Sequence, residues 1–275
     1  LILSAANLYT GDTTISGGKL QLGNTAALPS GASAGNIIDN AILDLAGFSQ
    51  TINGLSGAGT VDNLTGVSTY TLTIGSNNAT GAANTFDGVI INTIGTVAIT
   101  KTGTGTLTLS GINTYGGLTT VSQGIVSVKN NAALGNTTGT TSVTSGAAVQ
   151  VEGSGLSIAE VITLNGTGVL SGGALINLAN NNTWTGAITL GSAVRINSVA
   201  GLFTISTGGI AGAVSQPLTI DGAGNTTISV AIANTVSTLT KLNTGTLILS
   251  AENLYTGNTT ISGGKLQLGN TAALP

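Results

Sequence analysis

Two segments of this chain are almost the same. Residues 1–29 read LILSAANLYTGDTTISGGKLQLGNTAALP, and residues 247–275 repeat them with changes only at Ala6/Glu252 and Asp12/Asn258. Such close copies at an offset of 246 residues indicate a recent duplication of a long unit. We therefore expect residues 1–246 to be one sequence period and residues 247–275 to begin the next.

Weaker copies lie inside this period. One begins at offset 106 and divides the period into modules 1–106 and 107–246; it keeps Leu107, Leu109, Asn113, Tyr115, Gly117, Thr120, Ala132, Ala133 and Leu134. Two fainter traces contain Asn182, Trp184 and Gly186, and Asn84, Phe86 and Gly88. All share the order Asn, any residue, aromatic, any residue, Gly.

Within one copy the apolar residues alternate with period two, which is typical of β-strands. Leu107 and Leu109 form one such run, Thr119 and Val121 a second, and Val126 and Val128 a third. Glycine and asparagine between the runs supply turns. Three short strands with one buried face each cannot fold alone, so successive units must stack. The pattern predicts an all-β parallel β-helix over residues 1–275, a single continuous solenoid with about three strands and roughly 20 to 25 residues per coil.

Composition agrees with stacked coils. Only 5% of the residues are charged, and threonine and serine fill the outward positions. In a parallel stack each residue lies ~4.8 Å from its counterpart, where like charges would repel. We expect Leu109→Asp to be costly and Thr108→Asp, on an outward position, to cost little.

The missing residue types exclude several functions. The chain has no cysteine, methionine or histidine, which removes disulfides, Cys/His metal sites and imidazole or thiolate catalysis. A net charge of −3 gives no basic surface for nucleic acid. No apolar run reaches the 18 residues of a membrane-spanning helix. We predict no enzyme activity, no cofactor, no catalytic or metal site, and no membrane-spanning segment in this sequence.

A few acidic residues permit a sharper hypothesis. Asp39, Asp44 and Asp62 are close in sequence, and β-helical sugar-cleaving enzymes use acidic clusters, but Arg195 is the only arginine. We interpret these three as loop carboxylates. Glu152 and Glu160 are isolated, and Asp221-Gly-Ala-Gly-Asn is interpreted as a turn rather than a calcium-binding repeat.

Threonine and aromatic residues suggest two further binding hypotheses. The run Thr102–Thr108 resembles an ice-binding ladder but does not recur once per coil. Tyr9, Tyr115, Trp184 and Tyr255 could stack on sugar rings; their fixed place between two turns favours packing within the coil.

The segments Gly103–Val121 and Thr244–Ile261 resemble the autotransporter-associated β-strand repeat, also called the passenger-associated transport repeat. Lys101 and Lys241 match its Lys-Thr-Gly lead-in, although Leu242-Asn243 replaces Thr-Gly in the second segment. The resemblance implies a right-handed β-helix in a secreted or surface protein of bacteria. It identifies no ligand.

Two function classes follow. The first is a structural surface protein, a rigid rod, fibre or sheath segment with an adhesive or self-associating role. Its partners would be other copies, by end-to-end stacking or continuation of the array, and host or neighbouring-cell surfaces. The alternative is an autotransporter passenger with a carbohydrate-active or carbohydrate-binding site. The chain opens at Leu1 without an initiator methionine and stops at Pro275, so we expect a piece of a longer extracellular protein.

Overall fold

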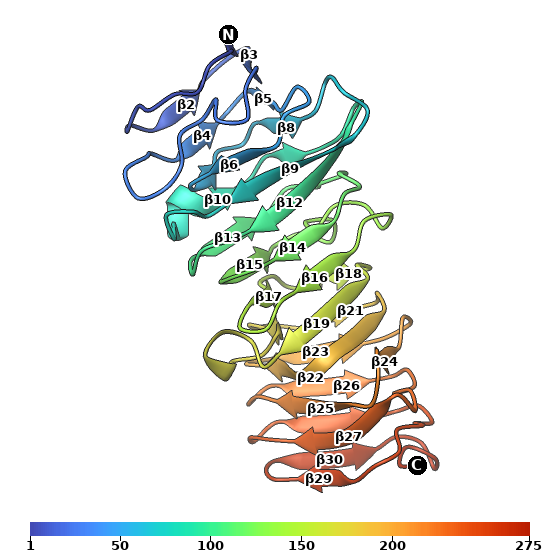
Figure 1. The fold of residues 1–275 in the computed structure, drawn as a ribbon. Helices are drawn as coiled ribbons and strands as arrows, with labels where there is room; N and C mark the ends of the chain where they lie inside the picture. The colour runs from blue at the N-terminus through green and yellow to red at the C-terminus, as the bar shows by residue number, and fades with distance from the viewer. The chain divides into compact units, whose positions relative to one another are not determined.

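The computed structural model describes all residues 1–275 and is almost entirely β-structure (Figure 1). It divides into two compact units, Leu1–Thr140 and Thr141–Pro275. Each unit is a parallel β-solenoid, which confirms the predicted fold class. That the coils of the two units form one continuous solenoid stays a prediction.

In the first unit the strands line three faces, and every pairing is parallel. One face holds β1 (Ile2–Leu3), β3 (Lys19–Leu22), β5 (Ile42–Asp44), β8 (Thr60–Asp62) and β11 (Val89–Ile90). A second holds β2 (Thr13–Ile15), β4 (Ile37–Asp39) and β7 (Leu55–Ser56), and continues through a Gly57–Phe86 bridge to β10 (Thr85–Phe86), β13 (Thr106–Leu109) and β15 (Ile125–Val128). The third holds β6 (Gln50–Ile52), β9 (Thr69–Ile74), β12 (Thr96–Lys101) and β14 (Thr119–Val121).

The second unit is built in the same way. Its first face holds β16 (Thr141–Val143), β19 (Ile162–Gly166), the start of β22 (Ile188–Ser198) and β24 (Ile210–Gly212). The second holds β17 (Ala148–Val151), β20 (Leu175–Asn177), the end of β22, β25 (Gln216–Asp221), β27 (Val236–Lys241) and β29 (Thr259–Ile261). The third holds β18 (Ser157–Ile158), β21 (Asn182–Trp184), β23 (Leu202–Ile205), β26 (Asn225–Ile228), β28 (Thr246–Leu249) and β30 (Lys265–Leu268).

Three strands per coil are therefore confirmed in each unit. The expected coil length was too narrow, because Ile42 pairs with Thr60, 18 residues on, whereas Thr60 pairs with Val89, 29 residues on. The longer coil holds a corner loop with the 3-10 turn η1 (Gly81–Asn84). The other helical turn is η2 (Val169–Ser171), and neither helix is long enough to cross a membrane.

The core of each unit is a stack of equivalent aliphatic side chains. On the first unit's first face Leu20, Leu43, Val61 and Ile90 occupy the same register position, and all are buried. In the second unit the buried side chains Trp184, Ile205, Ile228 and Leu249 follow one another in the same way. Burial contributes about 1.5 to 3 kcal/mol for each aliphatic residue, so stability is spread along the stack.

The in/out alternation holds with one correction. Leu107, Leu109 and Val121 are fully buried, as predicted, while Thr120 is partly exposed. Thr108 and its register neighbour Ser127 are also buried, although their position in the alternation points outward. The expectation that Thr108→Asp is tolerated was therefore wrong in its premise, because that position does not face open solvent.

Candidate functional site

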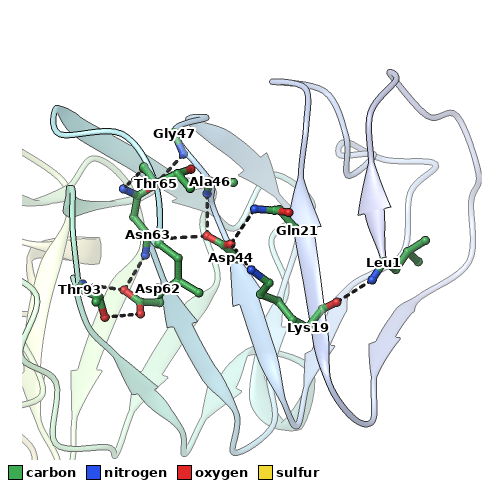
Figure 2. A network of polar contacts seen from close by, with 11 residues as sticks. Leu1, Lys19, Gln21, Asp44, Ala46, Gly47, Asp62, Asn63, Thr65 and Thr93 are labelled. Carbon is green, nitrogen blue, oxygen red and sulfur yellow. Dashed lines mark hydrogen bonds and ion pairs between the residues drawn. The ribbon is translucent and has the colours of Figure 1, made fainter.

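The three acids of the sugar-cleavage hypothesis lie in the first unit on two different faces. Asp39 is on β4, whereas Asp44 on β5 and Asp62 on β8 are register neighbours. Asp44 is fully buried and engaged on both oxygens: Oδ2 accepts from Lys19 Nζ and Gln21 Nε2, each at 3.1 Å, and Oδ1 accepts from the N–H groups of Ala46 at 2.9 Å and Leu64 at 3.0 Å. Figure 2 shows the cations and amides converging on this carboxylate.

Asp62 is engaged in the same manner. It accepts from the N–H of Asn63 at 2.7 Å, and from the N–H and Oγ1 of Thr93 at 2.8 and 2.6 Å (Figure 2). A carboxylate whose lone pairs are taken up by fixed backbone donors holds a turn in place. The geometry therefore supports the interpretation of Asp44 and Asp62 as structural, although they are buried rather than solvated.

Asp39 differs because it is less well satisfied. Oδ1 accepts from the N–H of Ala41 at 3.2 Å, while the buried Oδ2 has no partner. Burial raises the pKa of Asp39 to about 6, against the opposing effect of the Ala41 hydrogen bond. No group of three or more acidic side chains in the structure is placed to hold a metal ion.

The remaining charged candidates of the second unit also have structural partners. Arg195 donates to Asp221 Oδ2 at 3.1 Å and to the Ser171 carbonyl at 2.9 Å. Asp221 Oδ1 accepts from the N–H of Gly222 at 2.7 Å and from Asn243 Nδ2 at 2.6 Å, a turn of the kind predicted. Glu152 follows β17 at a half-buried position.

Glu160 is buried beside β16. Its Oε1 accepts from Thr141 Oγ1 at 2.8 Å, and burial raises its pKa to about 7, with the Thr141 hydrogen bond opposing. A single acid with one hydroxyl partner cannot supply both an acid and a base.

The repeated asparagine joins neighbouring coils. Asn113 Oδ1 accepts from the N–H of Ile90 in the preceding coil at 2.8 Å, and its Nδ2 donates to the Ala133 carbonyl in the following coil at 2.6 Å. Asn253 does the same between Ile232 and Ala273, at 2.9 and 2.7 Å. The fainter traces share part of this scheme, because Asn84 accepts from Leu55 at 3.1 Å and Asn182 accepts from Leu156 at 2.9 Å.

The aromatic residue of the motif packs inside the coil. Tyr115, Trp184 and Tyr255 are buried, which confirms packing over sugar stacking; Tyr9 is 38% exposed. The tyrosine hydroxyl is hydrogen-bonded to the threonine four residues on, as in Tyr115–Thr119 at 2.7 Å and Tyr9–Thr13 at 2.6 Å.

The glycine of the motif allows close contact between coils. A Cβ atom on Gly117 would lie 2.3 Å from the Val97 carbonyl oxygen, and one on Gly186 would lie 1.8 Å from that of Glu160. At Gly11, the equivalent position of residues 1–29, nothing lies within 4 Å. The Asn-x-aromatic-x-Gly pattern therefore describes a joint between coils.

Two buried lysines were not singled out for a structural role by sequence reasoning. Lys101 Nζ donates to the carbonyls of Thr102, Gly103 and Gln123 at 2.6, 2.7 and 3.3 Å. Burial lowers the pKa of Lys101 to about 8. Lys241 takes the same place, with its ammonium on the carbonyls of Leu242 and Asn243. The signal was a lysine at the end of a strand, directly before a turn.

The structure places the ice-binding run around a corner. Thr102 and Thr104 lie in the turn after β12, and only Thr106 and Thr108 belong to β13. Their neighbours on β15 are Ile125 and Ser127, so no threonine ladder forms there.

A hollow of ≈ 430 Å³ lies within the first coil, and Leu3, Tyr9, Ile15 and Leu20 are among the residues that line it. The equivalent tyrosine, Tyr255, is buried. The hollow therefore corresponds to the interior of a coil rather than to a built ligand site.

Comparison with known proteins bears on the repeats. A family model described as Passenger-associated-transport-repeat matches residues 1–22, 99–128 and 239–268. Each match contains one closed coil, in which β1 pairs with β3, β13 with β15, and β28 with β30.

One similar protein is the "Adhesin BmaC autotransporter" of Brucella suis biovar 1 (strain 1330), which is 35% identical over 127 residues. The alignment covers 46% of this chain and 4% of that protein, so the chain corresponds to a small part of it. No solved structure matches the chain. The resemblance inferred from the sequence is confirmed: the chain is a passenger-associated transport repeat protein.

Proposed function

We propose that the chain is a non-catalytic segment of a secreted or surface-exposed bacterial adhesin, in which the β-solenoid provides length, stiffness and an adhesive surface. The observation that carries this proposal is the occurrence of three passenger-associated transport repeats on a solenoid whose charged groups are mostly used to hold turns and coils together. Similarity to a named adhesin supports the adhesive part.

The carbohydrate-active alternative finds little support. Asp44 and Asp62 are saturated by hydrogen bonds, and Arg195 is paired with Asp221. We propose other copies of the chain and the surfaces of host or neighbouring cells as partners.

Adhesion is tested by displaying the chain on a non-adherent bacterium and counting cells attached to epithelial cells and to one another. Displayed wild-type chain should increase both counts over a display vector without passenger. Leu109→Asp, which disrupts the buried stack but leaves the outer surface unchanged, is the matched control, with display levels equalised by antibody labelling. Equal attachment of both variants would contradict a role for the solenoid, and release of reducing sugars from polysaccharide by the purified chain would favour the enzymatic alternative.

A further inference from the structure

The duplicated 29-residue sequence folds in the same way in both places. We name residues 1–29 coil A and residues 247–275 coil B. Leu3 pairs with Leu22 in coil A, and Leu249 pairs with Leu268 in coil B. The asparagine bond across the coil is also repeated, at 2.8 Å from Asn7 to the Ala27 carbonyl and at 2.7 Å from Asn253 to that of Ala273.

The two coils are covered on opposite sides. Coil A is followed by the coil containing β4 and β5, which pair with β2 and β3. Coil B is preceded by the coil containing β26 and β27, which pair with β28 and β29. One sequence is therefore seen with a downstream neighbour in one place and with an upstream neighbour in the other.

Burial of the apolar side chains records this difference. Ile15 and Leu22 of coil A are 5% and 1% exposed, whereas their counterparts Ile261 and Leu268 in coil B are 53% and 50% exposed. Because the residues are identical, the apolar face of coil B has the shape and chemistry that β4 and β5 cover in coil A.

Polar groups on the covering coil match coil B as well. Asp44 receives Lys19 and Gln21 of coil A (Figure 2), and coil B has Lys265 and Gln267 at these positions. The Gln50 side chain bonds both backbone groups of Leu28, donating to its carbonyl at 2.9 Å and accepting from its N–H at 3.2 Å. Leu274 offers the same two groups in coil B.

Neither sequence difference opposes this match. Asp12 Oδ1 accepts from the N–H of Asn36 at 2.7 Å, and the amide oxygen of Asn258 can accept the same bond. Ala6 and Glu252 are both exposed.

We propose that coil B binds a second copy of this chain by coil exchange: it takes the place of that copy's coil A against β4, β5 and Gln50. The exchanged coil would be covered on both sides, by β26 and β27 of its own chain and by β4 and β5 of the other. This inference deepens the self-association proposed above by naming the two surfaces that meet.

The test uses the complete chain with one coil weakened. Leu20→Asp places a carboxylate against Leu43 and loosens coil A, which opens β5 to coil B of another molecule. Light scattering after size-exclusion chromatography should show dimers and longer oligomers that increase with concentration, and at least severalfold more of them than for wild type. No increase over wild type would overturn the proposal.

The matched control is the double variant Leu20→Asp/Leu266→Asp, since Leu266 occupies in coil B the place of Leu20 in coil A. It exposes at least as much disturbed surface, so non-specific aggregation would persist, but coil exchange should return to the wild-type level. Equal oligomer content in the single and double variants would overturn the proposal.

Cross-linking locates the contact. Lys19 pairs with Ile42, and Ile42 with Thr60, so Lys265→Cys in one chain should form a disulfide with Ile42→Cys in a Leu20→Asp partner and far less with Thr60→Cys, one coil away. Oligomers that cross-link equally at both positions would refute coil exchange, while leaving self-association through another surface, and hence the proposed function, intact.

Discussion

Asn113 is hydrogen-bonded to a backbone group of the preceding coil: its Oδ1 accepts from the N–H of Ile90 at 2.8 Å. The same side chain donates to the following coil at Ala133. One amide thus satisfies two buried backbone groups at a corner where no strand pairing does so, which gives the asparagine of the repeat a physical function.

Asn113→Ala should therefore destabilise the chain. Each backbone group left unpaired costs about 1 to 3 kcal/mol. The urea midpoint, followed by far-ultraviolet circular dichroism, should fall clearly for Asn113→Ala. Asn7→Ala is the control, because Asn7 donates to Ala27 but has no bond to a preceding coil in this structure. Equal shifts for both variants would show that the bond to Ile90 contributes nothing.

Gly117→Ala should be harmful for a steric reason. Its Cβ atom would lie 2.3 Å from the Val97 carbonyl oxygen, so the coils must move apart. We expect a loss of about 1 to 3 kcal/mol, the range of overpacking substitutions. Gly11→Ala, with nothing within 4 Å, should leave the urea midpoint nearly unchanged. A destabilised Gly11→Ala would mean that intrinsic glycine flexibility, not contact, decides the residue.

Leu109→Asp should cost several kcal/mol, because it places a carboxylate in a dry aliphatic stack. The corrected control is Thr106→Asp in the same strand, since Thr106 is partly exposed whereas Thr108 is buried. Thermal unfolding should separate the two variants widely. Equal penalties would refute the assignment of inward and outward positions in β13.

Stability should decrease between about pH 4.5 and pH 7. The pKa of Glu160 is raised to about 7 by burial, so the folded state holds a proton that the unfolded state releases near pH 4.5. The contribution of Glu160 is therefore fully present below pH 4.5 and is lost as the pH rises through 7. Asp39, whose pKa is raised to about 6, acts in the same direction.

Urea unfolding at several pH values checks this. Glu160→Gln should flatten the decline, whereas Glu252→Gln, at an exposed position, should not. A decline that is as steep in Glu160→Gln as in wild type would assign it to other groups.

The sequence by itself determined the fold class, the three strands of a coil and the repeat. Leu107, Leu109 and Val121 could be assigned inward because strand alternation is local, and the Asn-x-aromatic-x-Gly pattern was visible because it recurs. Its physical meaning was not visible, since the partners of Asn113 lie more than 20 positions away in either direction for Ile90 and at 20 for Ala133.

Only the tertiary structure decided which polar groups are buried. Asp44, Asp62 and Lys101 looked like surface residues, but donors or carbonyls from neighbouring coils surround them. Coil length, the burial of Thr108 and the unequal covering of coils A and B were decided in the same way. The physical reason is that each depends on contacts between coils, and the loop lengths that bring one coil against the next are not encoded in the period-two pattern of a single strand.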